Sequence, residues 1–295
     1  MTFRIYPYKV GTASVQKLKS ELDALIIRTE NSRYRFSPEH IIINWGNSRR
    51  PSWMTEEIDD FILNKPEAVA VAANKLRTLQ LLTESGVPTI PWTTMKSDAE
   101  FWANTANKVY ARHVLDGHSG EGIEVIQANE NLEAGRMQDI ANELYSLGKA
   151  SLAEAVEEQI ELTNVEVPDA PLYTLGVENH GEYRVHVFDG DVILYQKKSR
   201  RVDEDGEIIT ADGEEADVRN LASNWVYRTG NLNRLERIEE LALNAVASLG
   251  LDFGAVDIIM DENLDVFVLE VNTAPGLGNE DSLVAYVEAF NSLVN

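Results

Sequence analysis

Two apolar runs joined by a short polar turn, at residues 256–276 (VDIIMDENLDVFVLEVNTAPG), constrain the fold of this chain more than any other stretch. Each run is short, rich in β-branched residues and bounded by turn-forming residues, a pattern typical of β-strands. Folding the runs about a four-residue loop at 262–265 places Asp261 across from Val266. The sequence therefore predicts an antiparallel hairpin whose second strand ends at a Pro-Gly pair.

Three oxygen-bearing side chains are predicted to converge on one face of this hairpin. The same register sets Asp257 directly across from Glu270, and directly opposed residues share a face. Asn272 shares it too because side chains alternate along a strand, whereas Leu269 and Val271 point the other way into a core. Two close carboxylates raise each other's pKa unless a cation lies between them, and ligands that are all oxygen favour a hard ion such as Mg²⁺. The alternative is an exposed hairpin with ordinary surface acids.

The charge balance limits the partners of the chain. Its 295 residues include 49 acidic and 26 basic ones, for a formal net charge of -23, which repels polyanions and argues against nucleic acid as a partner. The first fifty residues reverse this balance, with nine Lys or Arg and four acids. The basic loops there, around Arg33, Arg35, Arg49 and Arg50, either meet an anionic ligand or form a random basic patch.

Cysteine is absent, which excludes disulfides, thiolate nucleophiles and Cys metal sites. No run of eighteen apolar residues occurs, so no membrane span is predicted. Apolar residues make up 44% of the chain, enough for a substantial core. We expect a cytoplasmic protein that does not associate with membranes.

The chain is expected to form a mixed α/β and α+β fold in three parts. Residues 1–92 alternate short strands and helices, which favours a small α/β domain. Residues 93–176 hold apolar runs around a Gly-rich loop, and residues 177–295 hold two hairpins and an amphipathic helix. One helix is predicted over 64–86, with Asn64 as its cap.

A second hairpin is predicted about the dipeptide at 189–190, because Asp-Gly between alternating runs is a strong turn signal. Folding there places Glu182 opposite Lys197. The same face would carry three further side chains, those of Arg184, His186 and Tyr195. A cationic face of this kind would suit a phosphate group.

The tail of the first hairpin carries the pattern Glu-x-Asn-x-x-Pro-Gly, which chance would produce on the order of once per hundred thousand positions. Together with the Asp on the first strand, it resembles the metal-binding end of the ATP-grasp superfamily, and in particular of its carboxylate-amine ligases. Ribosomal-protein glutamate ligases resemble the segment EYRVHVFDGDVILYQKK, with a spacing that favours Lys198 over Lys197. Uncharacterised ATP-grasp proteins of tailed phages are similar in EYRVHVF, DGHSGEGI and GLDFGAVD. The resemblance spans roughly residues 70–280 and implies an ATP-grasp fold preceded by a Rossmann-like pre-grasp domain.

The resemblance also implies roles for individual residues. Metal would be held by Asp257, Glu270 and Asn272. ATP would contact Lys75, Arg112, Gly117, Ser119, Gly120, Gly122, Tyr173, Thr174 and Leu175. Catalytic contacts would come from Arg184, from Lys197 or Lys198, and from Arg219 and Asn220. Two positions depart from the family pattern, because Arg112 stands where a Lys is usual and the spacing at 219–220 is one residue off.

The function implied by the resemblance is an ATP-dependent carboxylate-amine ligase that works through an acyl phosphate, with ATP and two Mg²⁺ ions, or Mn²⁺, as cofactors. Its partners would be a small-molecule or peptide carboxylate and an amine, in the cytoplasm of a bacterium or a phage-infected host cell. A homodimer is one option for its assembly. Two alternatives remain open: an ATP-grasp kinase that acts on an alcohol, and an ATP-binding protein without turnover.

Overall fold

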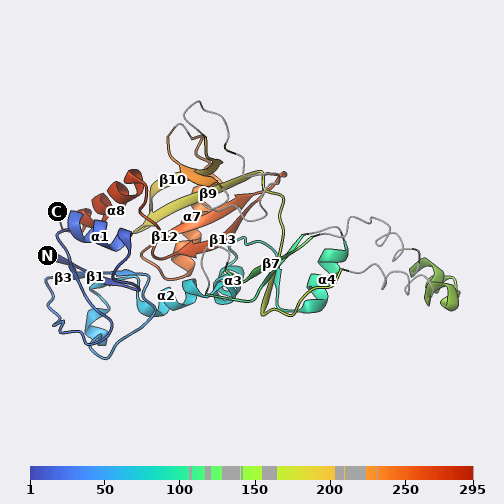
Figure 1. Cartoon of the computed structure of the whole chain (residues 1–295), viewed down its shortest axis with the longest axis horizontal. Helices are drawn as coiled ribbons and strands as arrows, with labels where there is room; N and C mark the ends of the chain where they lie inside the picture. Colours follow the sequence, from blue (N-terminus) through green and yellow to red (C-terminus); the bar gives the residue numbers. More distant parts are fainter. Residues whose placement is uncertain are drawn as a thin grey trace. The chain divides into compact units, whose positions relative to one another are not determined.

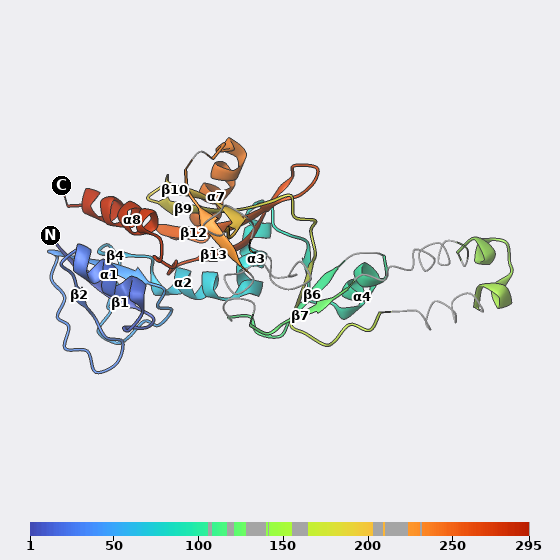
Figure 2. The same ribbon diagram turned by 45° about the horizontal axis from the view of Figure 1, so that its top comes forward.

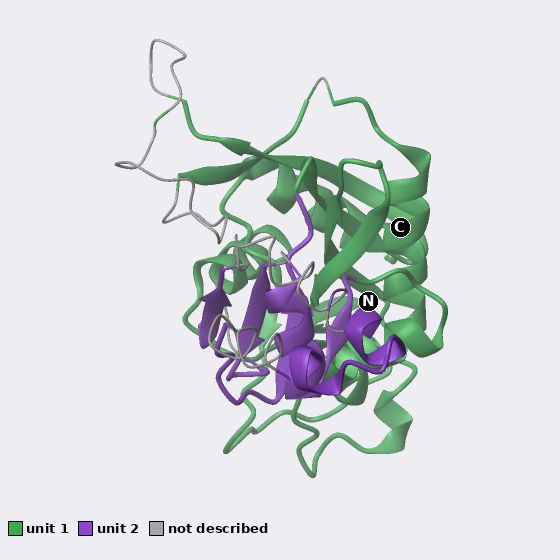
Figure 3. Ribbon diagram, turned by 90° about the vertical axis from the view of Figure 1, so that its right-hand side faces the viewer, with its two compact units in different colours: residues 1–89, 179–295 green, residues 90–178 purple. Residues whose placement is uncertain are grey.

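The computed structural model describes residues 1–105, 108–116, 121–127, 140, 142–154, 165–202, 209, 224–230 and 232–294. It divides into two compact units, drawn in two colours in Figure 3. Unit 1 combines residues 1–89 with residues 179–295, and unit 2 comprises residues 90–178. The regions predicted as first and third parts of the chain therefore pack together in one unit. Among the helices within these described ranges, none has the length and apolar character to cross a bilayer.

A parallel four-stranded sheet forms the N-terminal part of unit 1, in the order β2-β1-β3-β4 (Figures 1 and 2). Its strands are β1 (Thr2–Pro7), β2 (Leu25–Ile26), β3 (His40–Trp45) and β4 (Ile62–Leu63), with helix α1 (Ala13–Glu21) after β1 and the 3-10 turn η1 (Glu56–Ile58) before β4. Thr12 begins α1 because its side chain accepts a hydrogen bond from the Val15 amide. Val15 and Leu18 then bury the apolar side of α1 against β1. The expected α/β pattern is confirmed in this region.

The helix predicted over 64–86 is two helices, α2 (Pro66–Ala73) and α3 (Lys75–Glu84). The break falls at Asn74, whose backbone is extended (φ -99, ψ 110) and whose side chain accepts from the Arg77 amide as the cap of α3. Lys75 is therefore the first residue of a helix rather than a residue in the middle of one.

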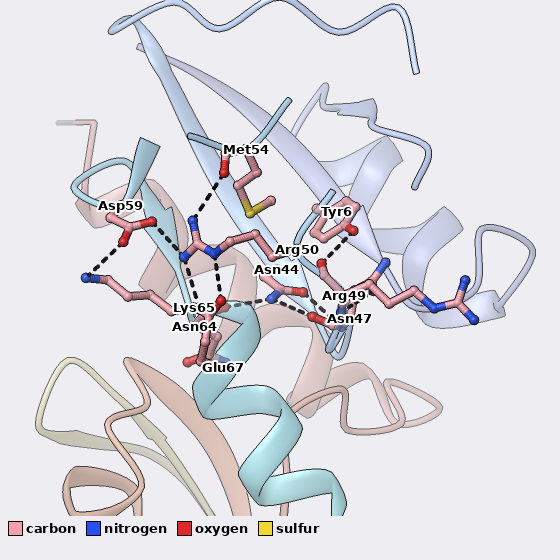
Figure 4. Close-up of polar contacts among 10 residues, drawn as sticks. All are labelled: Tyr6, Asn44, Asn47, Arg49, Arg50, Met54, Asp59, Asn64, Lys65 and Glu67. Carbon is pink, nitrogen blue, oxygen red and sulfur yellow. Dashed lines mark hydrogen bonds and ion pairs between the residues drawn. The ribbon is translucent and has the colours of Figure 1, made fainter. Parts of the chain in front are cut away.

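Asn64 does not cap a helix, contrary to the prediction, and instead joins the two sheets of unit 1. It is fully buried, with a left-handed backbone (φ 59). Its Nδ2 donates to the Phe253 carbonyl at 2.9 Å, and its Oδ1 accepts from the amides of Asp252 (2.8 Å) and Phe253 (3.1 Å). Asn44 at the end of β3 donates to the Asn64 carbonyl at 2.7 Å (Figure 4). This network fixes the turn that enters strand β12.

The second sheet of unit 1 is antiparallel, in the order β11-β10-β9-β12-β13. Its strands are β9 (Gly181–Phe188), β10 (Asp191–Arg200), β11 (Trp225–Arg228), β12 (Phe253–Met260) and β13 (Val266–Asn272). The amphipathic helix α7 (Glu236–Ser248) contacts β9, β12 and β13, and together with α2 and α3 it encloses the main apolar core (Figure 2). The C-terminal helix α8 (Glu280–Ser292) packs with α1 in a second core. On the face of the sheet opposite α7, Phe188 and Phe253 join this second core, and Arg184 and Asp257 lie further along the same strands.

Unit 2 contains an antiparallel sheet in the order β5-β8-β6-β7. Its elements are β5 (Trp92–Thr93), α4 (Lys96–Asn104), β6 (Val109–Arg112), β7 (Ile123–Ile126) and β8 (Leu172–Leu175). Ala99 and Ala103 of α4 pack against Val109 and Tyr173 in a small core of its own. The two apolar runs predicted around the Gly-rich loop are thus the paired strands β6 and β7.

Candidate active site

The hairpin of β12 and β13 places Asp257 opposite Glu270, as the sequence predicted. The turn of the hairpin and the pairing next to it differ from the prediction. Met260, not Asp261, pairs with Val266, and a bulge at Leu269 then shifts the register by one before Asp257. The longer turn and the bulge cancel, so the predicted pairing holds although the predicted loop is wrong.

The two carboxylates and the carboxamide form one cluster. Asn272 Nδ2 donates to Glu270 Oε1 at 3.2 Å and reaches Asp257 Oδ2 at 3.5 Å. Within the described part of the chain, no three His, Cys, Asp or Glu side chains are placed so that they could hold a metal ion together. The cluster therefore offers two carboxylates and one amide oxygen, a set of oxygen donors that suits Mg²⁺ with water or phosphate as its remaining ligands.

Each carboxylate faces a cation. Arg184 on β9 lies in register with Asp257, and its Nε and Nη2 donate to the two oxygens of Asp257 at 2.6 and 2.7 Å. Such a two-pronged contact is among the strongest between charged side chains. Lys75 at the start of α3 donates to Glu270 Oε2 at 3.2 Å. The break at Asn74 thus brings the predicted ATP lysine to the β12–β13 hairpin.

Burial and charge act in opposite directions on these acids. Burial raises the pKa of Asp257, while the guanidinium of Arg184 acts to lower it. Burial also acts to raise the pKa of Glu270. Lys75, Asn272 and Arg184 together outweigh burial and lower this pKa to about 2. Glu270 is therefore held as a carboxylate at neutral pH, which is the form that binds a cation.

The second predicted hairpin also forms, but with a register that differs from the predicted one. Asp189 and Gly190 make the turn, each with a positive φ (48 and 80). A bulge between Val192 and Leu194 shifts β10 by one residue, so Lys197 pairs with Tyr183 instead of Glu182. The predicted pairing of Glu182 with Lys197 is wrong.

Lys198, the other candidate, is the lysine on the polar face. Its Nζ donates to a carboxylate oxygen of Glu182, and both side chains are about nine-tenths buried, at 11% and 8% exposed. Lys197 lies on the core side, with its Nζ 5.6 Å from the ring centroid of Tyr183. Tyr195 is also on the core side, contrary to the prediction. We refer to Lys75, Arg184 and Lys198 as the cation row.

His186 lies on the polar face, as predicted, and is buried as a neutral ring. Its Nε2 donates to Gln196 Oε1 at 3.0 Å, and its Nδ1 accepts from the Tyr286 hydroxyl at 3.2 Å. Burial lowers its pKa to about 4, against an ordinary value of 6.5. His186 therefore links the sheet to α8 and brings no charge to the cluster.

Tyr227 on β11 belongs to this face and was not foreseen from the sequence. It pairs with Lys198, and its ring lies under two cations: Arg184 Cζ is 4.2 Å and Lys198 Nζ 5.2 Å from the ring centroid. No local signal in the sequence shows that residues 225–228 pair with β10.

The predicted nucleotide contacts of unit 2 have other partners within that unit. Arg112 ends β6, and its Nε donates to the buried Thr174 hydroxyl at 3.3 Å. Tyr173 belongs to the small core, and its hydroxyl donates to the Pro168 carbonyl. The Leu175 amide donates to the Pro91 carbonyl. Arg112 is thus the one charged side chain among these four residues.

Gly122 has a structural reason to be glycine. Its φ is 67, and a Cβ there would lie 2.6 Å from a methyl carbon of Val114. The remaining predicted contacts lie outside the described residues: Gly117, Ser119, Gly120, Arg219 and Asn220.

Comparison with solved structures identifies the architecture. The ATP-grasp ligase PsnB, solved in complex with a minimal precursor, matches 99% of each chain with a TM-score of 0.57 and 15% sequence identity. The chain has the ATP-grasp fold. D-alanine–D-alanine ligase from Bacillus anthracis shares this fold over 100% of this chain and 96% of its own, with a TM-score of 0.56 and 11% identity.

A third ATP-grasp neighbour is the macrocyclase MdnC from Microcystis aeruginosa, solved with its precursor peptide MdnA. It covers 100% of each chain, with a TM-score of 0.56 and 12% identity. No protein-family model and no curated protein matches the sequence. The architecture implied by the sequence resemblance is therefore confirmed, and activity has to be argued from the site itself.

Proposed function

We propose that this protein is an ATP-dependent carboxylate-amine ligase. The observation that carries the proposal is the convergence of Asp257, Glu270 and Asn272 with the cation row on one face of the five-stranded sheet. This arrangement combines oxygen ligands for a hard cation with positive side chains for phosphate oxygens. The ATP-grasp fold, which ligases that join carboxylates to amines also use, supports it.

The residues present fit a bound magnesium ion. Asp257, Glu270 and Asn272 would hold Mg²⁺, which supplies neutralisation of negative charge on phosphate oxygens. The low pKa of Glu270 supports this assignment because a ligand to Mg²⁺ has to be deprotonated. A second ion, or Mn²⁺ in place of Mg²⁺, is compatible with the same donors.

The cation row would bind and orient the reacting phosphate. In the reaction, a carboxylate oxygen of the first substrate attacks the γ-phosphorus of ATP, and ADP leaves with the electron pair of the broken P–O bond. An amine nitrogen then attacks the acyl carbon, inorganic phosphate leaves, and the nitrogen loses a proton as the amide forms. Arg184 and Lys198 are aligned to stabilise the transferring group, since fixed cations in a buried site act on developing charge without rearrangement.

Two further basic residues are assigned to the phosphate chain of ATP. Lys75 would contact the phosphate chain of ATP, and Arg112 would do so in place of the usual lysine, since guanidinium also binds phosphate well. PsnB and MdnC were solved with a precursor or precursor peptide, which favours a peptide carboxylate as the first substrate here. A small-molecule carboxylate remains the other option.

The proposal is tested by measuring ADP release with panels of amino acids, acidic peptides and amines. A ligase releases ADP only when both a carboxylate and an amine are present, and it forms an amide. A stable phosphorylated alcohol formed without an amine indicates a kinase instead. Tight ATP binding with no ADP release under any mixture indicates a protein that binds without turnover.

The metal assignment is tested by Glu270→Gln and Asn272→Asp. We expect Glu270→Gln to lose Mg²⁺-dependent nucleotide turnover by about 100-fold or more, because one anionic ligand is removed. The control is Glu262→Gln, in the exposed turn of the same hairpin, which should match the wild type. Full activity in both site variants would show that the cluster does not hold the metal.

A further inference from the structure

Tyr227 occupies a position that the proposed reaction does not yet use. Strand β11 lies at one edge of the sheet and pairs with β10, so that Tyr227 is directly opposite Lys198. Opposed residues share a face, and Tyr227 therefore lies on the polar face with Arg184.

The ring of Tyr227 contacts two of the three cations in the row. Arg184 Cζ lies 4.2 Å and Lys198 Nζ 5.2 Å from the ring centroid, both within the range of cation–π attraction. Each of these cations also has one carboxylate partner, Asp257 for Arg184 and Glu182 for Lys198. The ring therefore holds the two positive groups side by side while each keeps its own carboxylate.

The hydroxyl of Tyr227 is buried, and the described residues offer it no hydrogen-bond partner. Burial, followed by the nearby carboxylates of Asp257, Glu182 and Glu270, raises its pKa well above the ordinary value, so it stays an O–H donor at neutral pH. Leaving a buried hydroxyl unpaired costs folding free energy. A donor of this kind beside two cations is suited to an anionic oxygen that arrives with a ligand.

We propose that Tyr227 is a ligand-binding residue of this face: its ring positions Arg184 and Lys198, and its hydroxyl donates a hydrogen bond to an oxygen of the terminal phosphate of bound ATP. This inference rests on the proposed function. It adds a neutral donor to the charged groups already assigned, and it explains why an aromatic residue with a hydroxyl stands on the edge strand.

The test compares the binding of Mg²⁺-AMPPNP and Mg²⁺-ADP by isothermal titration calorimetry, because only the first carries a γ-phosphate, the terminal phosphate of ATP. Tyr227→Phe should weaken AMPPNP binding by about 10-fold or more, the effect of one hydrogen bond to a charged group, and leave ADP binding unchanged. Tyr227→Leu, which also removes the ring, should weaken AMPPNP binding further.

Thermal unfolding without ligand gives a second readout. Tyr227→Phe should unfold at the same or a higher temperature than the wild type, because it removes an unpaired buried hydroxyl. If the hydroxyl had a purely structural role, Tyr227→Phe would unfold at a lower temperature than the wild type. The matched control is Tyr195→Phe, on the core side of the same sheet, which should leave the affinities for both nucleotides unchanged.

The outcomes separate this proposal from the proposed function. Wild-type protein that binds neither nucleotide overturns both. Wild-type protein that binds both nucleotides, together with a Tyr227→Phe variant that binds AMPPNP equally well, overturns only the role of Tyr227. Equal losses for AMPPNP and ADP in Tyr227→Phe would also overturn it, since the hydroxyl would then not act on the terminal phosphate.

Discussion

Replacing Asn64 should loosen the connection between the two sheets of unit 1. Its side chain makes three hydrogen bonds to the turn at Asp252 and Phe253, all in a buried setting. At about 1 kcal/mol for each bond, Asn64→Gly should lower the free energy of unfolding by about 3 kcal/mol. Asn64→Ala should cost about 1 kcal/mol more, because a Cβ is strained in the left-handed region.

Asn31 provides the matched control, since it is exposed and has a similar left-handed backbone (φ 52). Asn31→Gly should leave stability unchanged, and Asn31→Ala should cost only the backbone strain, about 1 kcal/mol. The loss of unfolding free energy at Asn64, minus the loss for the same substitution at Asn31, therefore measures the contribution of the Asn64 hydrogen bonds.

The assay is urea unfolding followed by both tryptophan fluorescence and far-UV circular dichroism, so that a two-state analysis can be checked. Trp45 reports on the joint directly because it stacks on Phe253, with ring centroids 5.6 Å apart. If Asn64→Gly lies within about 0.5 kcal/mol of the wild type, the reasoning fails, because three buried hydrogen bonds cannot be removed at so little cost.

Two further predictions concern the polar face. The neutral His186, with a pKa of about 4 against 6.5 when unfolded, stabilises the protein above pH 6.5, and this contribution is lost as the pH falls toward 4. About 2 kcal/mol should disappear by pH 5, and unfolding of His186→Asn in urea should lack that pH dependence. Lys198→Met should lower the free energy of unfolding by about 3 kcal/mol, because the buried Glu182 carboxylate loses its ion pair with Lys198, and should lose nucleotide turnover. Lys197→Met is the control for both measurements, and equal effects of the two substitutions would contradict the observed register.

The sequence predicted the β12–β13 hairpin because its pattern is strictly local. Alternating apolar residues define the strands, and the face shared by Asp257, Glu270 and Asn272 follows from alternation alone. Bulges are harder to foresee, because whether a strand accommodates an extra residue depends on the residues that pack around it in the folded sheet. In β13 the bulge offset an error in the turn, whereas in β10 nothing offset it and Lys197 was paired wrongly.

Two other features show where local signals end. Asn74 is a good capping residue, so the break between α2 and α3 could have been considered from the sequence. Tyr227 is different, because it reaches Arg184 and Lys198 only through the pairing of β11 with β10. Nothing near Tyr227 in the sequence indicates that pairing, and its partners are 29 or more positions away.

The discontinuity of unit 1 has a consequence for the newly made chain. Thr89 bridges to Val268 and the His180 amide donates to the Met260 carbonyl, so both ends of the interruption are attached to the β12–β13 hairpin. A ribosome synthesises this hairpin after all of unit 2, whose own residues are contiguous. Unit 2 can therefore fold during translation. The apolar sides of α2 and α3 become buried only after β9, α7, β12 and β13 have been synthesised. The hairpin that carries the proposed metal ligands also closes the core, so a chain released early would lack the site and the fold together.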